Sequence, residues 1–268
     1  MYFSPAKVNL FFRVLSKRPD GYHEVASLYS AINLGDYISV NQAKKDRFES
    51  NLQVSDNLVL KALKAFRAES GIAEPVSIIL DKKVPIGAGL GGGSSNAATT
   101  LWALNELFGR PLVQEELIRM GSQIGSDVSF FFSSGLAYCT GRGEILQSVD
   151  FSFYEEFWIA KPECSLLTPQ VYSVCKPNAR SSESPLHILE SFRKNSPLFV
   201  NDLEEAAYQL LPNLKSFKED LQNLGFSKVV MTGSGAAFLC FGDVGFPELP
   251  STQFYRVQPR NRNLESWF

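Results

Sequence analysis

The stretch Pro85-Ile86-Gly87-Ala88-Gly89-Leu90-Gly91-Gly92-Gly93-Ser94-Ser95-Asn96-Ala97-Ala98 decides the fold. It follows an apolar run over residues 76–80, which predicts a strand, and leads into apolar residues at spacings of three and four over 97–108, which predict a helix. A helix start leaves backbone N–H groups unpaired, and glycine lets them approach an anion without a Cβ in the way. This order therefore predicts a phosphate-binding loop, with a flexible glycine hinge or a tight turn as the alternative. No lysine follows the glycines, so the GxxxxGK[ST] loop is excluded.

The composition is that of a globular protein with a slightly acidic balance: 268 residues, 44% hydrophobic, 20% charged, net charge −2. Such a chain forms one large domain or two small ones, and its charge disfavours nucleic acid or an acidic membrane as the main partner. Four widely spaced cysteines indicate no metal or disulfide framework and favour a reduced, cytoplasmic protein. The chain has no apolar run long enough for a membrane span, and its first residues do not resemble a signal peptide.

The first half of the chain begins with alternating apolar and polar residues. Residues 1–40 predict two or three antiparallel strands around a turn at residues 17–21, and residues 41–55 predict a surface loop or an edge hairpin. Asp56-Asn57 predicts the start of a helix that ends at Gly71. A short helix over residues 111–120, a loop over 121–127 and a strand over 136–139 follow the glycine-rich stretch.

The second half predicts strands over residues 157–160, 228–231, 238–241 and 254–257, and helices over residues 186–194, 202–211 and 212–224. Strands and helices alternate irregularly, with hairpins in place of regular βαβ units. This pattern favours an α+β fold with two lobes, each an antiparallel sheet covered by helices.

Pro85 to Ala98 resembles the second motif of the GHMP small-molecule kinases, the family of galactokinase, homoserine kinase and mevalonate kinase. Met231-Thr232-Gly233-Ser234-Gly235-Ala236 is similar to the third motif. Three segments resemble the members that act on a cytidine-diphosphate-linked methylerythritol: Ser4 to Leu10 with Arg18-Pro19-Asp20-Gly21-Tyr22-His23, Gly125 to Phe131, and Gly141-Arg142-Gly143-Glu144. Asn96 and Ser129 depart from the family pattern, which has Asp and Pro there.

The resemblance implies a two-lobed α+β GHMP kinase fold, each lobe an antiparallel or mixed sheet covered by helices, with the active site in the cleft. It implies an ATP- and phosphate-binding domain over residues 1–152 and a second domain over residues 153–268. The implied reaction is ATP- and Mg²⁺-dependent phosphorylation of a hydroxyl, the 2-hydroxyl, of the cytidylyl substrate in the non-mevalonate isoprenoid pathway. The alternatives are a GHMP kinase of homoserine or mevalonate type and a nucleotide-binding sensor without catalysis.

The resemblance assigns catalysis to Asp127, as the base that takes the hydroxyl proton, and to Lys7, which pairs with it and stabilises charge. By itself, Asp127 is more typical of a helix N-cap, and Lys7 of a lysine at the surface. We expect the two side chains to meet in the folded chain although 120 positions separate them.

The remaining site residues follow from the same resemblance, except that Asn57 is equally explained as a helix cap. The ATP and phosphate set is Asn57, Pro85, Gly87, Gly89, Leu90, Gly91, Gly92, Gly93, Ser94 and Ser95, with Ser95 also a weak Mg²⁺ ligand. The substrate set is Asn9, Tyr22, His23, Thr168 and Tyr172, in which His23 binds cytosine and Tyr172 stacks on it. Gly233, Ser234 and Gly235 form a supporting turn. We expect no nucleic acid or membrane partner, and a monomer or weak homodimer.

Overall fold

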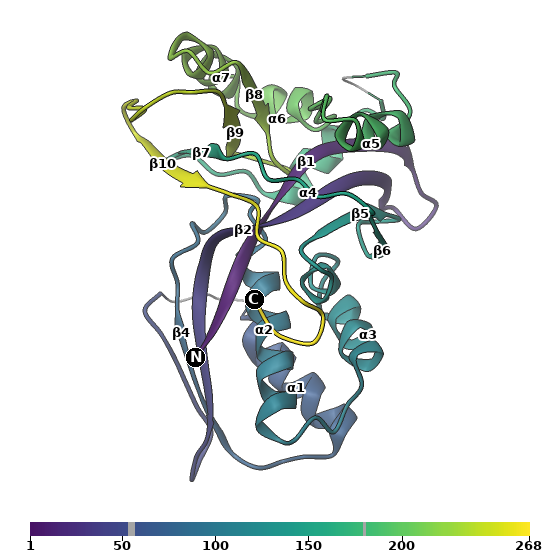
Figure 1. Cartoon of the computed structure of the whole chain (residues 1–268), viewed down its shortest axis with the longest axis vertical. Coiled ribbons are helices and arrows are strands. Elements are labelled where there is room, and N and C mark those ends of the chain that lie inside the picture. Colours follow the sequence, from purple (N-terminus) through teal and green to yellow (C-terminus); the bar gives the residue numbers. More distant parts are fainter. Residues whose placement is uncertain (53–56, 179–180) are drawn as a thin grey trace.

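A long antiparallel hairpin runs through both halves of the computed structural model, which describes residues 1–52, 57–178 and 181–268. Its strands are β1 (Tyr2–Lys17) and β2 (His23–Gln42), as the alternation of residues 1–40 predicts. Figure 1 shows both strands extending from the lower part of the molecule into the upper part. The hairpin is therefore the common framework on which residues from both parts are positioned.

The first sheet is completed by four shorter strands. They are β3 (Arg47–Ser50), β4 (Val76–Asp81), β5 (Leu136–Thr140) and β6 (Ile145–Ser148). In the described part of the chain the strand order is β3-β4-β2-β5-β6, and β1 pairs with β2. β3 pairs in parallel with β4, so the surface loop or edge hairpin expected over residues 41–55 contains a parallel edge strand instead.

Helices α1 (Leu58–Ser70), α2 (Gly92–Leu107) and α3 (Gln114–Ile124) lie together beside this sheet (Figure 1). Their apolar faces bury Phe66, Leu101 and Leu117 in one core with residues of β2 and β4. α1 ends at Gly71, whose φ of 72° suits glycine, as predicted. The predicted helix start at Asp56 lies outside the described residues.

The third helix differs from its sequence-based prediction. It begins at Gln114 and continues to Ile124, so it covers most of the loop predicted over residues 121–127. The Glu116 side chain accepts a hydrogen bond from the Val113 N–H at 2.9 Å, which fixes the start after Pro111. A single 3₁₀ turn, η1 (Ser129–Phe132), then brings the apolar run of residues 128–132 into the core.

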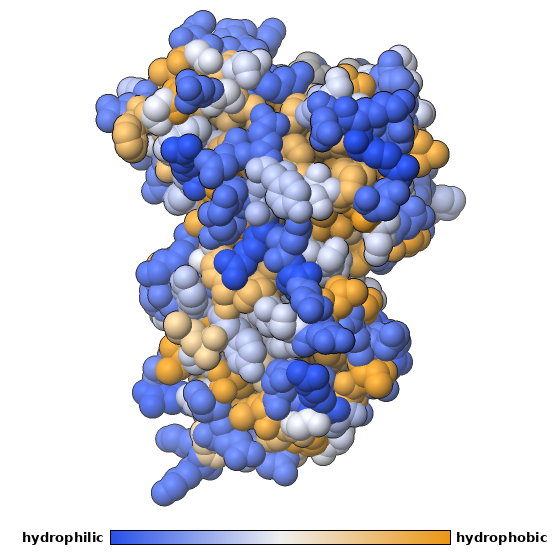
Figure 2. Space-filling model, viewed as in Figure 1, coloured by the Kyte–Doolittle hydropathy of each residue, from blue (hydrophilic) through white to orange (hydrophobic). Residues whose placement is uncertain are grey.

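The second sheet has the order β10-β7-β9-β8 among the described residues. Its strands are β7 (Phe157–Pro162), β8 (Lys228–Met231), β9 (Phe238–Phe241) and β10 (Thr252–Val257). The helices of this half are α4 (Thr168–Val174), α5 (Pro185–Arg193), α6 (Glu204–Leu210) and α7 (Asn213–Asn223). Figure 2 shows a waist between the upper and lower parts of the molecule, with polar and apolar residues mixed over the visible face.

After β10 the chain leaves the second sheet and returns to the first. The Arg260 N–H donates to Ala31 of β2, and the Arg262 N–H donates to Ser134. The Arg262 guanidinium is buried, donates to the carbonyl oxygens of Phe132 and Ser133, and lies over the Trp102 ring. The last residues therefore close the core beside α2 and η1. No helix in the described residues is long and apolar enough to cross a membrane.

Candidate active site

The glycine-rich loop lines a small hollow at the start of α2. Gly91 is the N-cap of α2, and no side chain caps this helix, so N–H groups of its first turn remain for a ligand. The hollow has a volume of about 270 Å³. Its lining includes the predicted phosphate residues Pro85, Gly87, Gly89, Leu90, Gly91, Gly92, Gly93 and Ser94, together with Asn57, Leu58, Lys82 and others.

Three glycines of the loop, Gly87, Gly89 and Gly91, have positive φ angles, and the last two lie against other parts of the site. A Cβ on Gly91, whose φ is +65°, would lie 2.8 Å from Cγ of Lys7. A Cβ on Gly89, whose φ is +74°, would lie 3.1 Å from the carbonyl oxygen of Gly235. The turn Gly233-Ser234-Gly235 thus abuts the loop, as predicted, and only glycine fits both the backbone angles and the space.

Ser95 is placed differently from the expectation. It is fully buried, and its Oγ lies 2.8 Å from Oγ of Ser4 on β1, away from the hollow. This placement argues against the predicted contacts of Ser95 with phosphate or Mg²⁺, because the hydroxyl already has a partner inside the protein. Ser94, one residue earlier on the helix, lines the hollow.

Lys7 and Asp127 lie next to each other. Lys7 Nζ is 3.2 Å from Oδ2 of Asp127, so the predicted meeting of these side chains is present. Lys7 is almost fully buried, and its backbone N–H donates to the Leu90 carbonyl of the loop at 2.9 Å. Asp127 keeps 29% of its side chain exposed, which leaves the carboxylate accessible to a ligand.

Tyr29 on β2 completes this cluster. Its hydroxyl lies 3.3 Å from Asp127 Oδ1, and Lys7 Nζ sits 4.3 Å from the centre of its ring. Burial raises the pKa of Tyr29, and the negative charge of Asp127 raises it further, so the phenol stays protonated and can donate to the carboxylate. Tyr29 was not found from the sequence, because an aromatic residue in an apolar strand is typical of a core.

Asn9 does not line the cavity for which it was predicted. It is 1% exposed. Its Oδ1 accepts a hydrogen bond from Lys7 Nζ at 2.9 Å, and its Nδ2 donates to Ser27 at 2.9 Å. Since both ends of the amide are used inside the protein, Asn9 orients Lys7 rather than binding a substrate directly.

A larger hollow of about 750 Å³ adjoins the first, since Gly89 and Gly91 line both cavities. It is lined by Lys7, Asp127, Tyr29, Phe12, Lys17, Gly21, Tyr22, His23, Gly89, Gly91, Ser126, Arg142, Thr168, Pro169, Tyr172, Ser173, Gly233 and Ser234. The predicted residues Tyr22, His23, Thr168 and Tyr172 are thus brought to one cavity from distant segments.

The aromatic end of this hollow combines β2 with α4. The rings of His23 and Tyr172 have centroids 5.1 Å apart and planes inclined by 33°. Burial lowers the pKa of His23, and the charge of Lys17 lowers it further, so the imidazole is neutral near pH 7. Thr168 Oγ1 lies 2.8 Å from Ser234 Oγ and ties α4 to the supporting turn.

Arg142 and Lys17 bring positive charge to the same cavity and were not predicted. The Arg142 guanidinium lies 4.8 Å from the centre of the Tyr22 ring. The sequence analysis identified the segment Gly141-Arg142-Gly143 as a motif. It did not assign a binding role to the Arg142 side chain.

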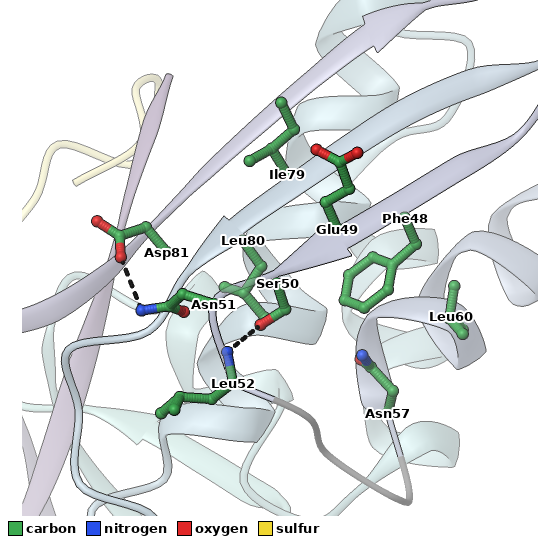
Figure 3. A pocket seen from close by; sticks show the side chains of 10 residues that line it. All are labelled: Phe48, Glu49, Ser50, Asn51, Leu52, Asn57, Leu60, Ile79, Leu80 and Asp81. Atoms are coloured by element: carbon green, nitrogen blue, oxygen red, sulfur yellow. Dashed lines mark hydrogen bonds between the residues drawn. The ribbon is translucent and has the colours of Figure 1, made fainter.

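Asn57 caps a helix and also lines two hollows. Its Oδ1 accepts a hydrogen bond from Val59 N at 2.9 Å and caps α1. It also lines the hollow at the start of α2 and a wider, open one of about 1240 Å³ that extends over β3 and β4. Figure 3 shows the wider hollow, with Leu60, Phe48 and Asn57 on one side and Asn51 and Asp81 on the other.

The chain resembles one group of known proteins over most of its length. The family model described as "GHMP kinases N terminal domain" matches residues 57–135. The chain is 44% identical to "4-diphosphocytidyl-2-C-methyl-D-erythritol kinase" of Protochlamydia amoebophila, over 99% of this chain and 92% of that protein. It is also 44% identical to the chloroplastic enzyme of that name from Arabidopsis thaliana, over 92% of this chain and 68% of that protein.

Solved structures agree with this result. The crystal structure of a "4-(cytidine 5'-diphospho)-2C-methyl-D-erythritol kinase" superposes with a TM-score of 0.83 at 29% identity, covering 97% of this chain and 99% of that one. A homoserine kinase from Cytophaga hutchinsonii superposes with a TM-score of 0.66 at 15% identity, which shows a shared fold alone. The α+β two-lobed GHMP kinase fold predicted from the sequence is confirmed.

Proposed function

Because the chain belongs to the family of 4-diphosphocytidyl-2-C-methyl-D-erythritol kinases, we propose that the residues described above carry out that reaction. The protein is a GHMP-type kinase that uses ATP to phosphorylate a hydroxyl of 4-diphosphocytidyl-2-C-methyl-D-erythritol. We propose the 2-hydroxyl as the acceptor and the 2-phosphate as the product, as the family resemblance implies, in a step of the non-mevalonate isoprenoid precursor pathway.

One observation carries the proposal: the two hollows share Gly89 and Gly91, and the Lys7–Asp127 ion pair lies beside them. The smaller hollow suits the phosphates of ATP, since it is lined by glycines and the uncapped start of α2. The larger hollow suits the acceptor. A phosphoryl group held at the shared glycines would face a hydroxyl held beside Asp127.

Asp127 acts as the general base in this proposal. Its carboxylate takes the proton of the acceptor hydroxyl as the oxygen attacks the γ-phosphorus, and the bond between that phosphorus and the ADP oxygen breaks. Lys7, 3.2 Å from Asp127, stabilises the negative charge on the reacting groups. Asn9 and Tyr29 hold the pair in place by their hydrogen bonds.

The cytidylyl end of the substrate would bind in the aromatic part of the larger hollow. Neutral His23 offers both a donor and an acceptor to the edge of cytosine. Tyr172 and Tyr22 offer rings for stacking, and Arg142 and Lys17 offer positive charge to the diphosphate. Thr168 supports this end through its contact with Ser234.

Mg²⁺ fits this site as the companion of ATP. No group of three or more His, Cys, Asp and Glu side chains in residues 1–52, 57–178 and 181–268 could hold a metal ion. Kinase Mg²⁺ ions are held mainly by substrate phosphates and water, with one or two carboxylates. We therefore propose that the phosphates of ATP and water would hold the ion, with the Ser94 hydroxyl of the smaller hollow as the protein group that contributes, and that the ion would neutralise charge on the phosphates.

We also propose domains over residues 1–152 and 153–268, each with one of the two sheets as its centre. A monomer or a weak homodimer is proposed, which the presence of both hollows within one chain supports. The four free cysteines support a cytoplasmic location.

The test is ADP release from Mg-ATP with four acceptors: 4-diphosphocytidyl-2-C-methyl-D-erythritol, mevalonate, homoserine and galactose. We expect turnover with the cytidylyl acceptor alone. Turnover with a different acceptor would keep the kinase and refute the role given to His23 and Tyr172. Binding of ATP without any turnover would favour a nucleotide sensor instead.

A further inference from the structure

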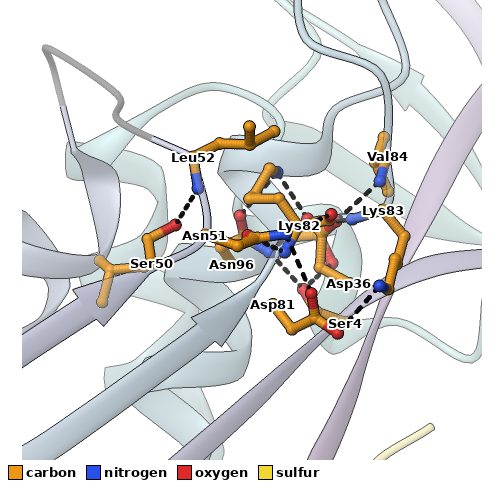
Figure 4. Close-up of polar contacts among 12 residues, drawn as sticks. Ser4, Asp36, Ser50, Asn51, Leu52, Asp81, Lys82, Lys83, Val84 and Asn96 are labelled. Atoms are coloured by element: carbon orange, nitrogen blue, oxygen red, sulfur yellow. Dashed lines mark hydrogen bonds and ion pairs between the residues drawn. The ribbon is translucent and has the colours of Figure 1, made fainter.

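The Asp36 carboxylate on β2 is fully buried and accepts four hydrogen bonds. Oδ1 accepts the backbone N–H groups of Lys83 at 2.6 Å and Val84 at 2.8 Å. Oδ2 accepts the Lys82 ammonium at 2.6 Å and the Asn96 side-chain amide at 2.8 Å. Figure 4 shows these groups converging on Asp36 from the turn after β4 and from α2.

The four donors lie on both sides of the glycine-rich loop in the sequence. Lys82, Lys83 and Val84 come directly before it, and Asn96 lies in the first turns of the helix that follows it. One carboxylate therefore joins the two ends of the loop. Lys82 Nζ closes the arrangement, because it also donates to Oδ1 of Asn96 at 3.0 Å.

Neighbouring side chains hold both ends of this arrangement. Ser4 of β1 accepts a hydrogen bond from Asn96 at 2.9 Å and contacts Ser95. Asn51, next to β3, accepts the Lys82 backbone N–H at 2.8 Å and donates to the Lys82 carbonyl at 3.2 Å. The ends of the loop are thus fixed to β1, to β2 and to the residue that follows β3.

We propose that Asp36 is a positioning residue for the glycine-rich loop: it clamps residues 82–84 to Asn96, so that the loop N–H groups face a nucleotide phosphate without further rearrangement. The inference rests on the proposed function in one respect, namely that this loop binds the phosphates of ATP. Preorganised donors bind an anion more tightly, because their ordering does not have to occur during binding. Lys82 balances the charge of Asp36, so the carboxylate does not repel the phosphates.

A buried carboxylate could instead serve only to hold the fold together, and the chain contains a matched example. Asp202 is also fully buried, accepts Nε of Arg13 at 2.8 Å and accepts the Val14 N–H at 2.9 Å. These partners belong to β1 and do not include the loop. Asp202 therefore provides the control for a purely structural role.

The experiment compares Asp36→Asn with Asp202→Asn. An amide replaces one acceptor oxygen by a donor, so one pair of donors at Asp36 loses its acceptor. We expect the Kd for MgADP, measured by calorimetry, and the KM for ATP to rise at least about tenfold in Asp36→Asn. The KM for the cytidylyl acceptor should stay within about twofold.

Asp202→Asn should lower the melting temperature and leave the Kd for MgADP within about twofold. An unchanged Kd in folded Asp36→Asn would overturn the proposal. Equal losses in the binding of both substrates by both variants would overturn it as well, because that result would indicate general loosening.

Asn96→Ala keeps the Asp36 contacts to residues 82–84 and removes the link to α2, together with the Asn96 hydrogen bonds to Lys82 and Ser4. We expect its Kd for MgADP to rise about threefold, and an unchanged value would overturn the proposal even if Asp36→Asn does not fold. MgADP binding needs no acceptor. A wild-type protein that binds MgADP but phosphorylates no acceptor would refute the proposed function and leave this inference standing.

Discussion

The two hollows that meet at Gly89 and Gly91 are built from different parts of the chain. The smaller one is lined mainly by the continuous segment of residues 85–94 and presents the uncapped start of α2. The larger one is lined by side chains from β1, β2, α4, the turns around residues 127 and 142, and the turn at 233–234. Backbone geometry shapes the first, whereas tertiary packing assembles the second. Changes in the two should therefore have different kinetic signatures.

The largest effect is expected at the junction of the two hollows. Asp127→Asn removes the proposed base, because an amide cannot take the hydroxyl proton. We expect turnover to fall at least about 10²-fold, the lower limit for general-base catalysis. MgADP binding should change little, since the loop is untouched. Steady-state kinetics with calorimetry measures both, and full turnover in the variant would exclude Asp127 from the chemistry.

A smaller effect is expected from a substitution at Gly91, which lines the smaller hollow. Gly91→Ala places a Cβ 2.8 Å from Cγ of Lys7 at a φ of +65°. A Cβ this close must displace Lys7 or the loop, so we expect kcat/KM for ATP to fall roughly tenfold, as for a small misplacement of catalytic groups. Initial rates at varied ATP measure this.

Gly71→Ala is the matched control for that change. Gly71 has a φ of +72°, and a Cβ added there would have no neighbour within 4 Å, so the variant carries the same backbone strain far from the loop. It should lower stability and leave kcat/KM unchanged. A similar kinetic loss in both variants would mean that strain alone, rather than the shape of the hollow, explains the result.

The smallest effect is expected at His23 in the larger hollow, where binding of the acceptor should depend on pH. Burial and the charge of Lys17 lower the pKa of His23, so this histidine binds fewer protons when folded than when unfolded. Its contribution to stability is therefore present above about pH 6.5 and is lost as the pH falls toward the lowered folded value. The KM for the cytidylyl acceptor should be constant near neutrality and rise several-fold on acidification.

His23→Gln keeps a hydrogen-bonding side chain that does not titrate. Its acceptor KM should be higher at neutral pH but flat across the acid range, while the KM for ATP follows the wild type. An acid rise of the same size in His23→Gln would assign the titration to another group.

The same contrast explains what the sequence predicts. The glycine-rich loop, α2 and the hairpin of β1 and β2 were predictable because local patterns determine them. The meeting of Lys7 with Asp127 came only from the resemblance, since no local pattern joins β1 to the segment before η1. Tyr29 carried no signal, because its polar role depends on a hydroxyl at the edge of an apolar core.

The differences between the sequence-based expectations and the structure have the same origin. Ser95 and Asn9 belong to motifs, but their side chains turn inward to Ser4 and to Lys7. β3 was hidden because its partner, β4, lies beyond α1 in the sequence. Motif membership thus predicts the segments of the site, and the packing decides which side chains face the two hollows.

The path of the chain after β10 has a consequence for the order of folding during synthesis. Trp267 donates to the Phe3 carbonyl across 264 positions and packs against Trp102 of α2. Proteins made on the ribosome generally complete their N-terminal part first. Here the segment that closes the core beside α2 is synthesised after the strands β7–β10 of the second sheet. The core of the first sheet can therefore be completed only after the second sheet has been synthesised.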